Sequence, residues 1–76
     1  MDLIDYEGKT VRLTDTDGEI YEGYAADYVF ADDNEPVEVD AIILDYPVRE
    51  SDGYKYETPV EFTEPEIHSI EVIDSW

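Results

Sequence analysis

Hydrophobic and polar residues alternate along most of the chain, and Gly, Asp or Pro interrupts the alternation at short intervals. A period of two is typical of short β-strands that bury one face. Strands are predicted over residues 9–14, 19–28, 37–44 and 54–62, and a last strand carries Ile67, Ile70, Val72 and Ile73. Residues 2–7 are predicted to form a single short helical turn, which Gly8 ends. We therefore expect one all-β domain over residues 1–76.

Two explanations compete for the acidic segment DTDG at residues 15–18. A calcium loop of the EF-hand type needs Gly at its sixth position, Glu at its twelfth and helices on both sides. Here Gly18 is the fourth residue of the segment, and the flanking residues alternate as strands do. An Asp-Gly pair between alternating apolar runs is typical of a tight hairpin turn. We predict a hairpin at Asp17-Gly18 and a second turn or loop at Asp52-Gly53.

Gly23 lies inside the predicted second strand. A glycine in a strand costs stability and usually marks a bend, a bulge or a close approach of two backbones. A strongly curved strand of a small closed barrel needs such a residue, so we predict that this strand bends at Gly23 and belongs to both halves of a barrel. Pro59 has no N–H to donate, which predicts a bend or an edge position in the fourth strand.

The formal net charge of −18 limits the partners that the chain can bind. The chain has 22 acidic residues and only four basic ones, which are scattered along the sequence: Lys9, Arg12, Arg49 and Lys55. Nucleic acid and anionic membranes both attract clustered Lys and Arg, so we expect neither as a partner. The acidity has four competing explanations. It belongs to a solvated surface, it adapts the protein to salt, it attracts a basic partner or a divalent cation, or it mimics a nucleic acid.

Catalytic and cofactor chemistry finds little support in the sequence. The chain has no Cys, its serines lack a matching base, and its carboxylates are too numerous for one pair to stand out. Strand parity places His68 opposite Ile67, facing outward. We expect a protein that is not an enzyme, and we assign no catalytic residue, no cofactor and no metal ligand. The loop cluster of Asp32, Asp33 and Glu35, with Asp40, is either a cation site or an ordinary solvated loop.

Seven tyrosines are more than a core of this size can hide, because a chain of 76 residues buries roughly 60% of its surface on folding. They either wall the core or contribute to a docking surface, where Tyr is enriched. The N-terminus has neither a basic leader nor a long apolar run, so we expect a cytoplasmic protein.

Three segments resemble the Sm-like (LSm) family. GKTVRL at residues 8–13 and DGEIYEG at 17–23 match its first motif of Gly-Lys-x-Val, a turn glycine and Tyr-x-Gly, and PEIHSIEVI at 65–73 is similar to its second motif. The resemblance implies a small five-stranded, strongly bent antiparallel SH3-like (Sm-like) barrel with a short N-terminal helical turn. It also implies subunits that assemble into a ring.

The departures from the family concern its RNA-binding loops. Residues 27–36 read DYVFADDNEP, with Asn34 displaced from the expected position, and residues 63–66 read TEPE where members that bind RNA have Arg-Gly or Lys-Gly. We therefore expect an acidic, non-catalytic interaction module that forms a homo-oligomeric ring or docks a protein partner, for which open edges of the fourth and last strands would serve. A nucleic-acid mimic and an atypical RNA-binding protein that relies on aromatic stacking are the alternatives.

Overall fold

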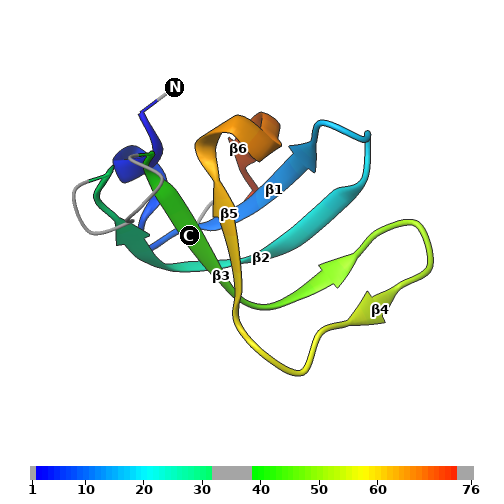
Figure 1. Cartoon of the computed structure of the whole chain (residues 1–76). Coiled ribbons are helices and arrows are strands. Elements are labelled where there is room, and N and C mark those ends of the chain that lie inside the picture. The colour runs from blue at the N-terminus through cyan, green and yellow to red at the C-terminus, as the bar shows by residue number, and fades with distance from the viewer. Residues whose placement is uncertain (1, 32–38, 74–76) are drawn as a thin grey trace.

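The computed structural model describes residues 2–31 and 39–73 and contains a six-stranded antiparallel sheet with short 3-10 helices (Figure 1). In chain order the elements are η1 (Leu3–Tyr6), β1 (Thr10–Asp15), β2 (Ile20–Val29), β3 (Ala41–Arg49), β4 (Tyr54–Lys55), β5 (Val60–Thr63), η3 (Glu64–Glu66) and β6 (Ile67–Val72). The all-β prediction and the N-terminal helical turn are confirmed. The predicted strand 54–62 is divided into β4 and β5, so the sheet has six strands where five were expected.

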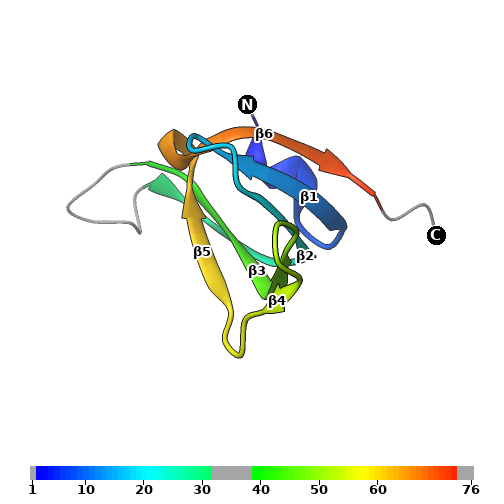
Figure 2. The same ribbon diagram turned by 90° about the vertical axis from the view of Figure 1, so that its right-hand side faces the viewer.

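The sheet is strongly curved and barrel-like, as Figures 1 and 2 show. Its strands follow the order β4-β3-β2-β1-β6, and β5 pairs with β3 beside that path. The first half of β3 pairs with β5 and its last two residues pair with β4. Among the residues that the structure describes, no ladder joins β5 to β6. The sheet therefore has β6 as one edge and β4 with β5 as the other.

The concave side of the sheet holds a small apolar core. Val11 and Leu13 are fully buried, as the alternation predicts for the first strand. The buried cluster consists of Leu3, Val11, Leu13, Ala25, Ile42, Leu44, Phe62 and Ile67. Half-buried residues pack around it: Tyr6, Tyr21, Tyr28, Val60 and Ile70. Each strand except the two-residue β4 contributes to this core or its rim, which is how so short a chain holds a curved sheet together.

Gly23 lies where β2 and β3 approach most closely. Glu22 pairs with Val48 and Tyr24 with Asp45, so two residues of β3 lie opposite the single Gly23. A Cβ atom at Gly23 would lie 3.2 Å from the Cα of Pro47, which is too close for an ordinary contact. Of the three features that a glycine in a strand usually marks, the bulge and the close approach are present at Gly23. β2 pairs with both β1 and β3, as the barrel prediction requires.

The hairpin predicted at Asp17-Gly18 is confirmed. The N–H of Asp15 donates to the carbonyl of Glu19 at 2.9 Å, and Gly18 has φ 87°. The Asp15 carboxylate accepts the N–H groups of Asp17 and Glu19, each at 2.9 Å, so it ties the turn together. The first residue of the acidic segment DTDG at residues 15–18 therefore has a structural role. Gly53 also has a positive φ, of 70°, in the predicted second turn.

The predicted third strand is displaced along the chain. It was expected over residues 37–44, whereas β3 covers Ala41–Arg49. Residues 37 and 38 lie outside the described residues. Pro47 is buried within this strand, because the bulge opposite Gly23 accommodates it. Tyr46 precedes it with φ 44°, a conformation that is uncommon for a residue other than glycine.

Candidate interaction surface

The seven tyrosines divide between core and surface. Tyr6, Tyr21 and Tyr28 pack against the core, and Tyr56 is half-buried. About half of the surface of each remaining tyrosine is exposed, and these residues are Tyr24, Tyr46 and Tyr54. The first explanation, that tyrosines wall the core, therefore applies to Tyr6, Tyr21 and Tyr28, and a docking role stays a prediction for the exposed three. Burial raises the pKa of Tyr21 to about 12, as expected for a phenol on the rim of the core.

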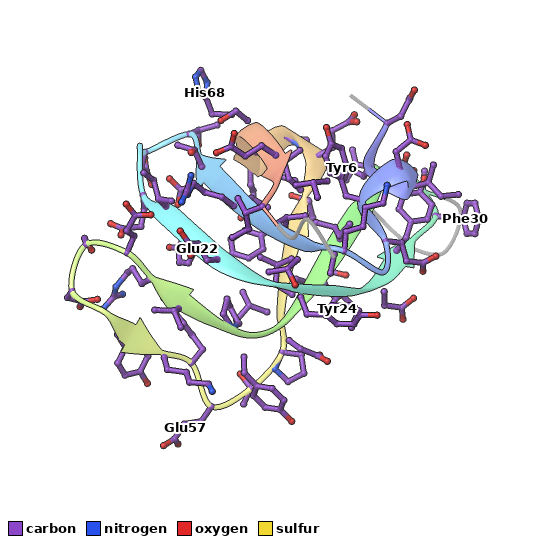
Figure 3. The ribbon with its side chains drawn as sticks, turned by 180° about the vertical axis from the view of Figure 1, so that it is seen from behind. Tyr6, Glu22, Tyr24, Phe30, Glu57 and His68 are labelled. Atoms are coloured by element: carbon purple, nitrogen blue, oxygen red, sulfur yellow. The ribbon has the colours of Figure 1, made fainter. Side chains whose placement is uncertain are left out.

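His68 lies at an irregularity of the edge strand. Thr14 pairs with Ser69 and Asp15 with Ile67, which leaves His68 as the extra residue of a bulge. Its side chain is exposed and projects away from the ribbon, as Figure 3 shows. The predicted outward orientation is confirmed.

The predicted acidic cluster of Asp32, Asp33 and Glu35 lies outside the described residues. Asp40, its fourth member, is described, and its Oδ1 accepts the N–H of Ala31 at 2.9 Å. A hydrogen bond to Asp40 also raises the pKa of Tyr28 to about 12. Asp40 thus fastens the end of β2. In the ranges 2–31 and 39–73, no three His, Asp or Glu side chains are grouped so that they could hold a metal ion.

Arg12 stands among three carboxylates on the outer face of the sheet. Its guanidinium lies 2.9 Å from Glu22, 3.0 Å from Glu71 and 3.7 Å from Glu50. Glu71 and Glu22 are its cross-strand partners on β6 and β2, so these contacts form a row across three strands. We call Glu71, Glu22 and Glu50 the carboxylate row. Hydrogen bonds to Glu22 and Glu71 raise the pKa of Arg12. Three negative groups share one positive group, so the row remains acidic.

Arg49, at the end of β3, contacts Asp52 and two tyrosines. Its Nε and one terminal nitrogen donate to the two oxygens of Asp52, at 3.0 and 2.6 Å. Its guanidinium lies 5.4 and 5.8 Å from the ring centres of Tyr54 and Tyr56. The paired guanidinium lowers the pKa of Asp52 to about 2. Lys9 also bonds within the chain, to the carbonyl of Asp5, so three of the four bases already have acidic or carbonyl partners.

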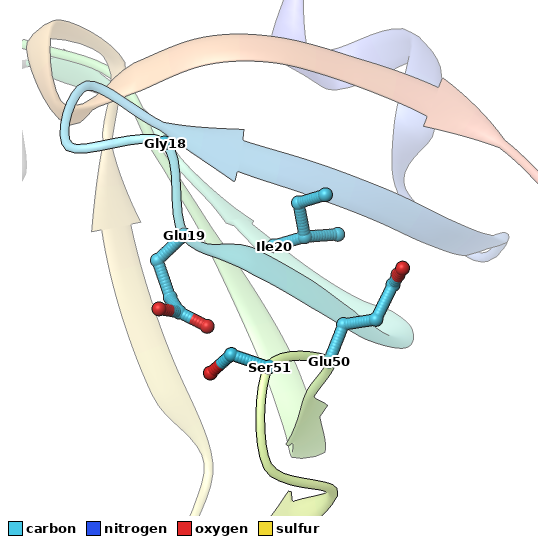
Figure 4. Close-up of a pocket in the computed structure, with 5 residues that line it drawn as sticks. All are labelled: Gly18, Glu19, Ile20, Glu50 and Ser51. Carbon is cyan, nitrogen blue, oxygen red and sulfur yellow. The ribbon is translucent and has the colours of Figure 1, made fainter.

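A hollow of about 190 Å³ opens beside the hairpin (Figure 4). It is lined by Gly18, Glu19, Ile20, Glu50 and Ser51. Figure 4 shows the Glu50 side chain turned toward β1, whereas the side chains of Glu19 and Ser51 point away from β1. Within the described part of the chain, Oε1 of Glu19 is buried without a hydrogen-bond partner. The lining therefore offers two carboxylates and one serine hydroxyl.

The outward side of β6 is an open edge. The N–H of Ile73 donates to the carbonyl of Thr10 at 2.9 Å, so by strand alternation the backbone of Glu71 also faces β1. The N–H and C=O groups of Ile70 and Val72 then point away from β1, and none of the described strands pairs with them. Val72 is 42% exposed and Ile73 37%. We call the outward backbone of Ile70 and Val72 the open edge.

The outward side of β5 differs, and we call it the blunted edge, made of Pro59, Glu61 and Thr63. The N–H of Glu64 donates to the backbone carbonyl of Asp40, so the backbone of Glu64 faces β3. By strand alternation, the backbone groups of Glu61 and Thr63 then point away from β3. Pro59 has no N–H, and the N–H of Thr63 is taken by the Glu66 carboxylate at 3.0 Å. The same carboxylate accepts the Thr63 hydroxyl at 2.6 Å. Only Glu61 keeps an outward donor along this edge.

Sequence reasoning predicted that both edges would be open and missed the blunting of one. The signal was present in TEPE at residues 63–66, because Thr followed by Glu three residues later is a capping box. We interpreted that segment only as the loss of a phosphate-binding pair.

Comparison with models of known protein families finds no match for the chain, and comparison with curated proteins finds none either. Over residues 2–31 and 39–73, no helix is both long enough and apolar enough to cross a membrane.

Proposed function

We propose that the protein is a non-catalytic, acidic interaction module of the Sm-like type, which binds another protein chain by strand addition. The observation that carries the proposal is the open edge of β6. A strand whose N–H and C=O groups are unpaired is a template for a further strand, and proteins that do not use such an edge usually protect it. Here the protection lies on β5, whereas exposed Val72 and Ile73 accompany the unprotected strand.

A docked protein partner is favoured over a ring of identical copies. A ring built from β5–β6 contacts would have to use the blunted edge, on which Pro59 and the bonded Thr63 offer no donor. It would also bring together chains that each carry a net charge of −18. Such repulsion is screened only beyond roughly 8 Å at physiological salt.

Nucleic acid is a poor partner for the described surface. Arg12 and Arg49 would have to leave their carboxylate partners to reach a phosphate. Mimicry of nucleic acid remains the second proposal, because the row of Glu71, Glu22 and Glu50 around Arg12 is an ordered line of acids. A mimic would bind through this outer face and would leave the open edge unused.

The test combines light scattering with capture of partners from a lysate. The proposal expects a monomer at both low and high ionic strength, together with capture of a protein that does not itself bind nucleic acid. If light scattering detects a ring at high salt, self-assembly replaces docking as the proposed function. Capture confined to nucleic-acid-binding proteins and lost with salt would favour mimicry. If the protein neither assembles nor captures a partner, the proposed function is overturned.

A further inference from the structure

We propose that the open edge of β6 takes up an extended segment of a basic partner protein, in which apolar residues alternate with Lys or Arg. This inference rests on the proposed function and specifies its partner. The apolar side chains would lie beside Ile70 and Val72, and the basic side chains beside Glu71.

The backbone of the open edge provides the attachment. Ile70 and Val72 present two N–H and two C=O groups on one side of β6, two residues apart. An added strand would lie about 4.8 Å away and pair with these groups. The bulge at His68 ends the regular part of the edge on one side. The contact is therefore short, and side chains must supply much of its selectivity.

The inner face of β6 calls for apolar partner residues. Val72 pairs with Val11 and Ile70 with Leu13, and both β1 residues are fully buried. Ile70 and Val72 thus continue the core to the margin of the sheet, where β6 is the last described strand. Val72 is left 42% exposed. A neighbouring strand with an apolar residue on this face would cover Val72 in the way that β1 covers its other side.

The outer face of β6 calls for a basic partner residue. Glu71 is the outermost member of the carboxylate row and its side chain is 61% exposed. Arg12 already neutralises one of the three carboxylates, which leaves the row with an excess of two negative charges. An added strand places one side chain next to Glu71, at a separation that suits a charged pair. The net charge of −18 also attracts a basic segment from a distance.

A second copy of this chain fits the site less well. Its β6, with the sequence IHSIEV, carries Glu71 and no Lys or Arg. Its β5, with the sequence VEFT, carries Glu61 and the blunted edge. Either of these strands would place acid beside acid, and β4, the remaining edge strand, has only two residues. A segment with alternating apolar and basic residues matches both faces at once.

The probe is a capped peptide of alternating Lys and Val, compared with a Lys–Gly peptide of the same charge and a Glu–Val peptide of the same apolar pattern. Binding to the intact chain is measured by calorimetry at physiological salt. We expect the Lys–Val peptide to bind at least about tenfold more tightly than either control, because each control removes one of the two contacts. Equal binding of the Lys–Gly peptide would show attraction by charge alone and overturn the proposal.

Substitutions on β6 locate the contact. Val72→Pro removes one outward N–H without removing a bond to β1, since edge strands tolerate proline where the N–H faces outward. It should weaken the Lys–Val peptide about tenfold, whereas Val72→Ala keeps the N–H and should weaken it less. Glu71→Gln should weaken binding more than Glu57→Gln, a matched loss of charge at the far end of the molecule (Figure 3). Circular dichroism checks that each variant folds.

Amide exchange of the intact chain gives a measurement that needs no variant. The Lys–Val peptide should slow exchange at Ile70 and Val72. Tight binding that leaves both amides unchanged, or that Val72→Pro does not weaken, would overturn the assignment to β6 and strand addition there. A partner captured from a lysate would then support an interaction module that binds through another surface. Pairing of two copies through β6 in the absence of peptide would overturn the basic partner in favour of self-association.

Discussion

The two edges of the sheet, β6 and β5, are made from neighbouring parts of the chain and are treated in opposite ways. β5 lies between Pro59 and the Glu66 carboxylate, which leaves only the Glu61 donor facing outward. On the outward side of β6, the backbone of both Ile70 and Val72 has no partner among the described residues. A chain that blunts one edge has the means to blunt the other. This difference is the observation on which our proposal of a partner at the β6 edge rests.

The largest loss of stability should come from Gly23→Val, which disturbs the contact between β2 and β3 in the middle of the sheet. A Cβ there would lie 3.2 Å from the Cα of Pro47, and a branched side chain needs more room still. Forcing atoms into a packed site costs about 1–3 kcal/mol. Urea denaturation should show a loss of stability of that size. Ala26→Val, at an exposed position of the same strand, is the matched control, and an equal loss in both variants would contradict the role given to Gly23.

Glu66→Ala should make β5 resemble β6. The substitution removes the acceptor of the Thr63 N–H and hydroxyl, and loss of such a cap costs about 1 kcal/mol. Exchange of the Thr63 amide should accelerate, and light scattering should detect more association as a second edge opens. Glu66→Gln keeps an amide oxygen as acceptor and should behave more like the native chain. Unchanged exchange at Thr63 would show that Glu66 does not blunt the edge.

Arg12→Gln should loosen β6 without opening β5. Arg12 links Glu71 on β6 to Glu22 on β2, and its removal leaves three carboxylates close together. Stability should fall, and the difference from the native chain should shrink at high salt because screening weakens interactions between exposed charges. Urea denaturation at low and high salt measures this, and Arg12→Lys, which keeps the charge, is the control. A difference that does not depend on salt would contradict the electrostatic explanation.

The smallest effect concerns the turn between β3 and β4. The Arg49 guanidinium lowers the pKa of Asp52 from 3.8 to about 2, so the folded state favours the ionised carboxylate. The resulting stabilisation is complete above the ordinary value and is lost as the pH falls through about 2. Carbon NMR of the Asp52 carboxyl group should show a midpoint near 2, and Arg49→Gln should raise it. A midpoint at the ordinary value in the native chain would contradict the pairing.

Local patterns predicted much of the fold. Alternation located Val11 and Leu13 in the core, and the Asp17-Gly18 pair predicted its hairpin from turn chemistry alone. The position of β3 could not be predicted in this way, because Pro47 is accommodated by Gly23 on a different strand. A residue that breaks strands in general is tolerated here by a tertiary contact.

The candidate surface was only partly predictable. Scattered bases were visible in the sequence, but the convergence of Glu22, Glu50 and Glu71 on Arg12 depends on strand register. The difference between the edges depends on which backbone groups alternation turns outward, and a shift of one residue would reverse it. The resemblance to the Sm-like family stays a prediction.

Amide hydrogen exchange of the free protein tests the open edge most directly. The account predicts slow exchange at Glu71 and Ile73, whose N–H groups face β1, and fast exchange at Ile70 and Val72, independent of protein concentration. Slow exchange at Ile70 and Val72 in dilute solution would mean that the edge is already covered within the chain, and it would contradict the central claim.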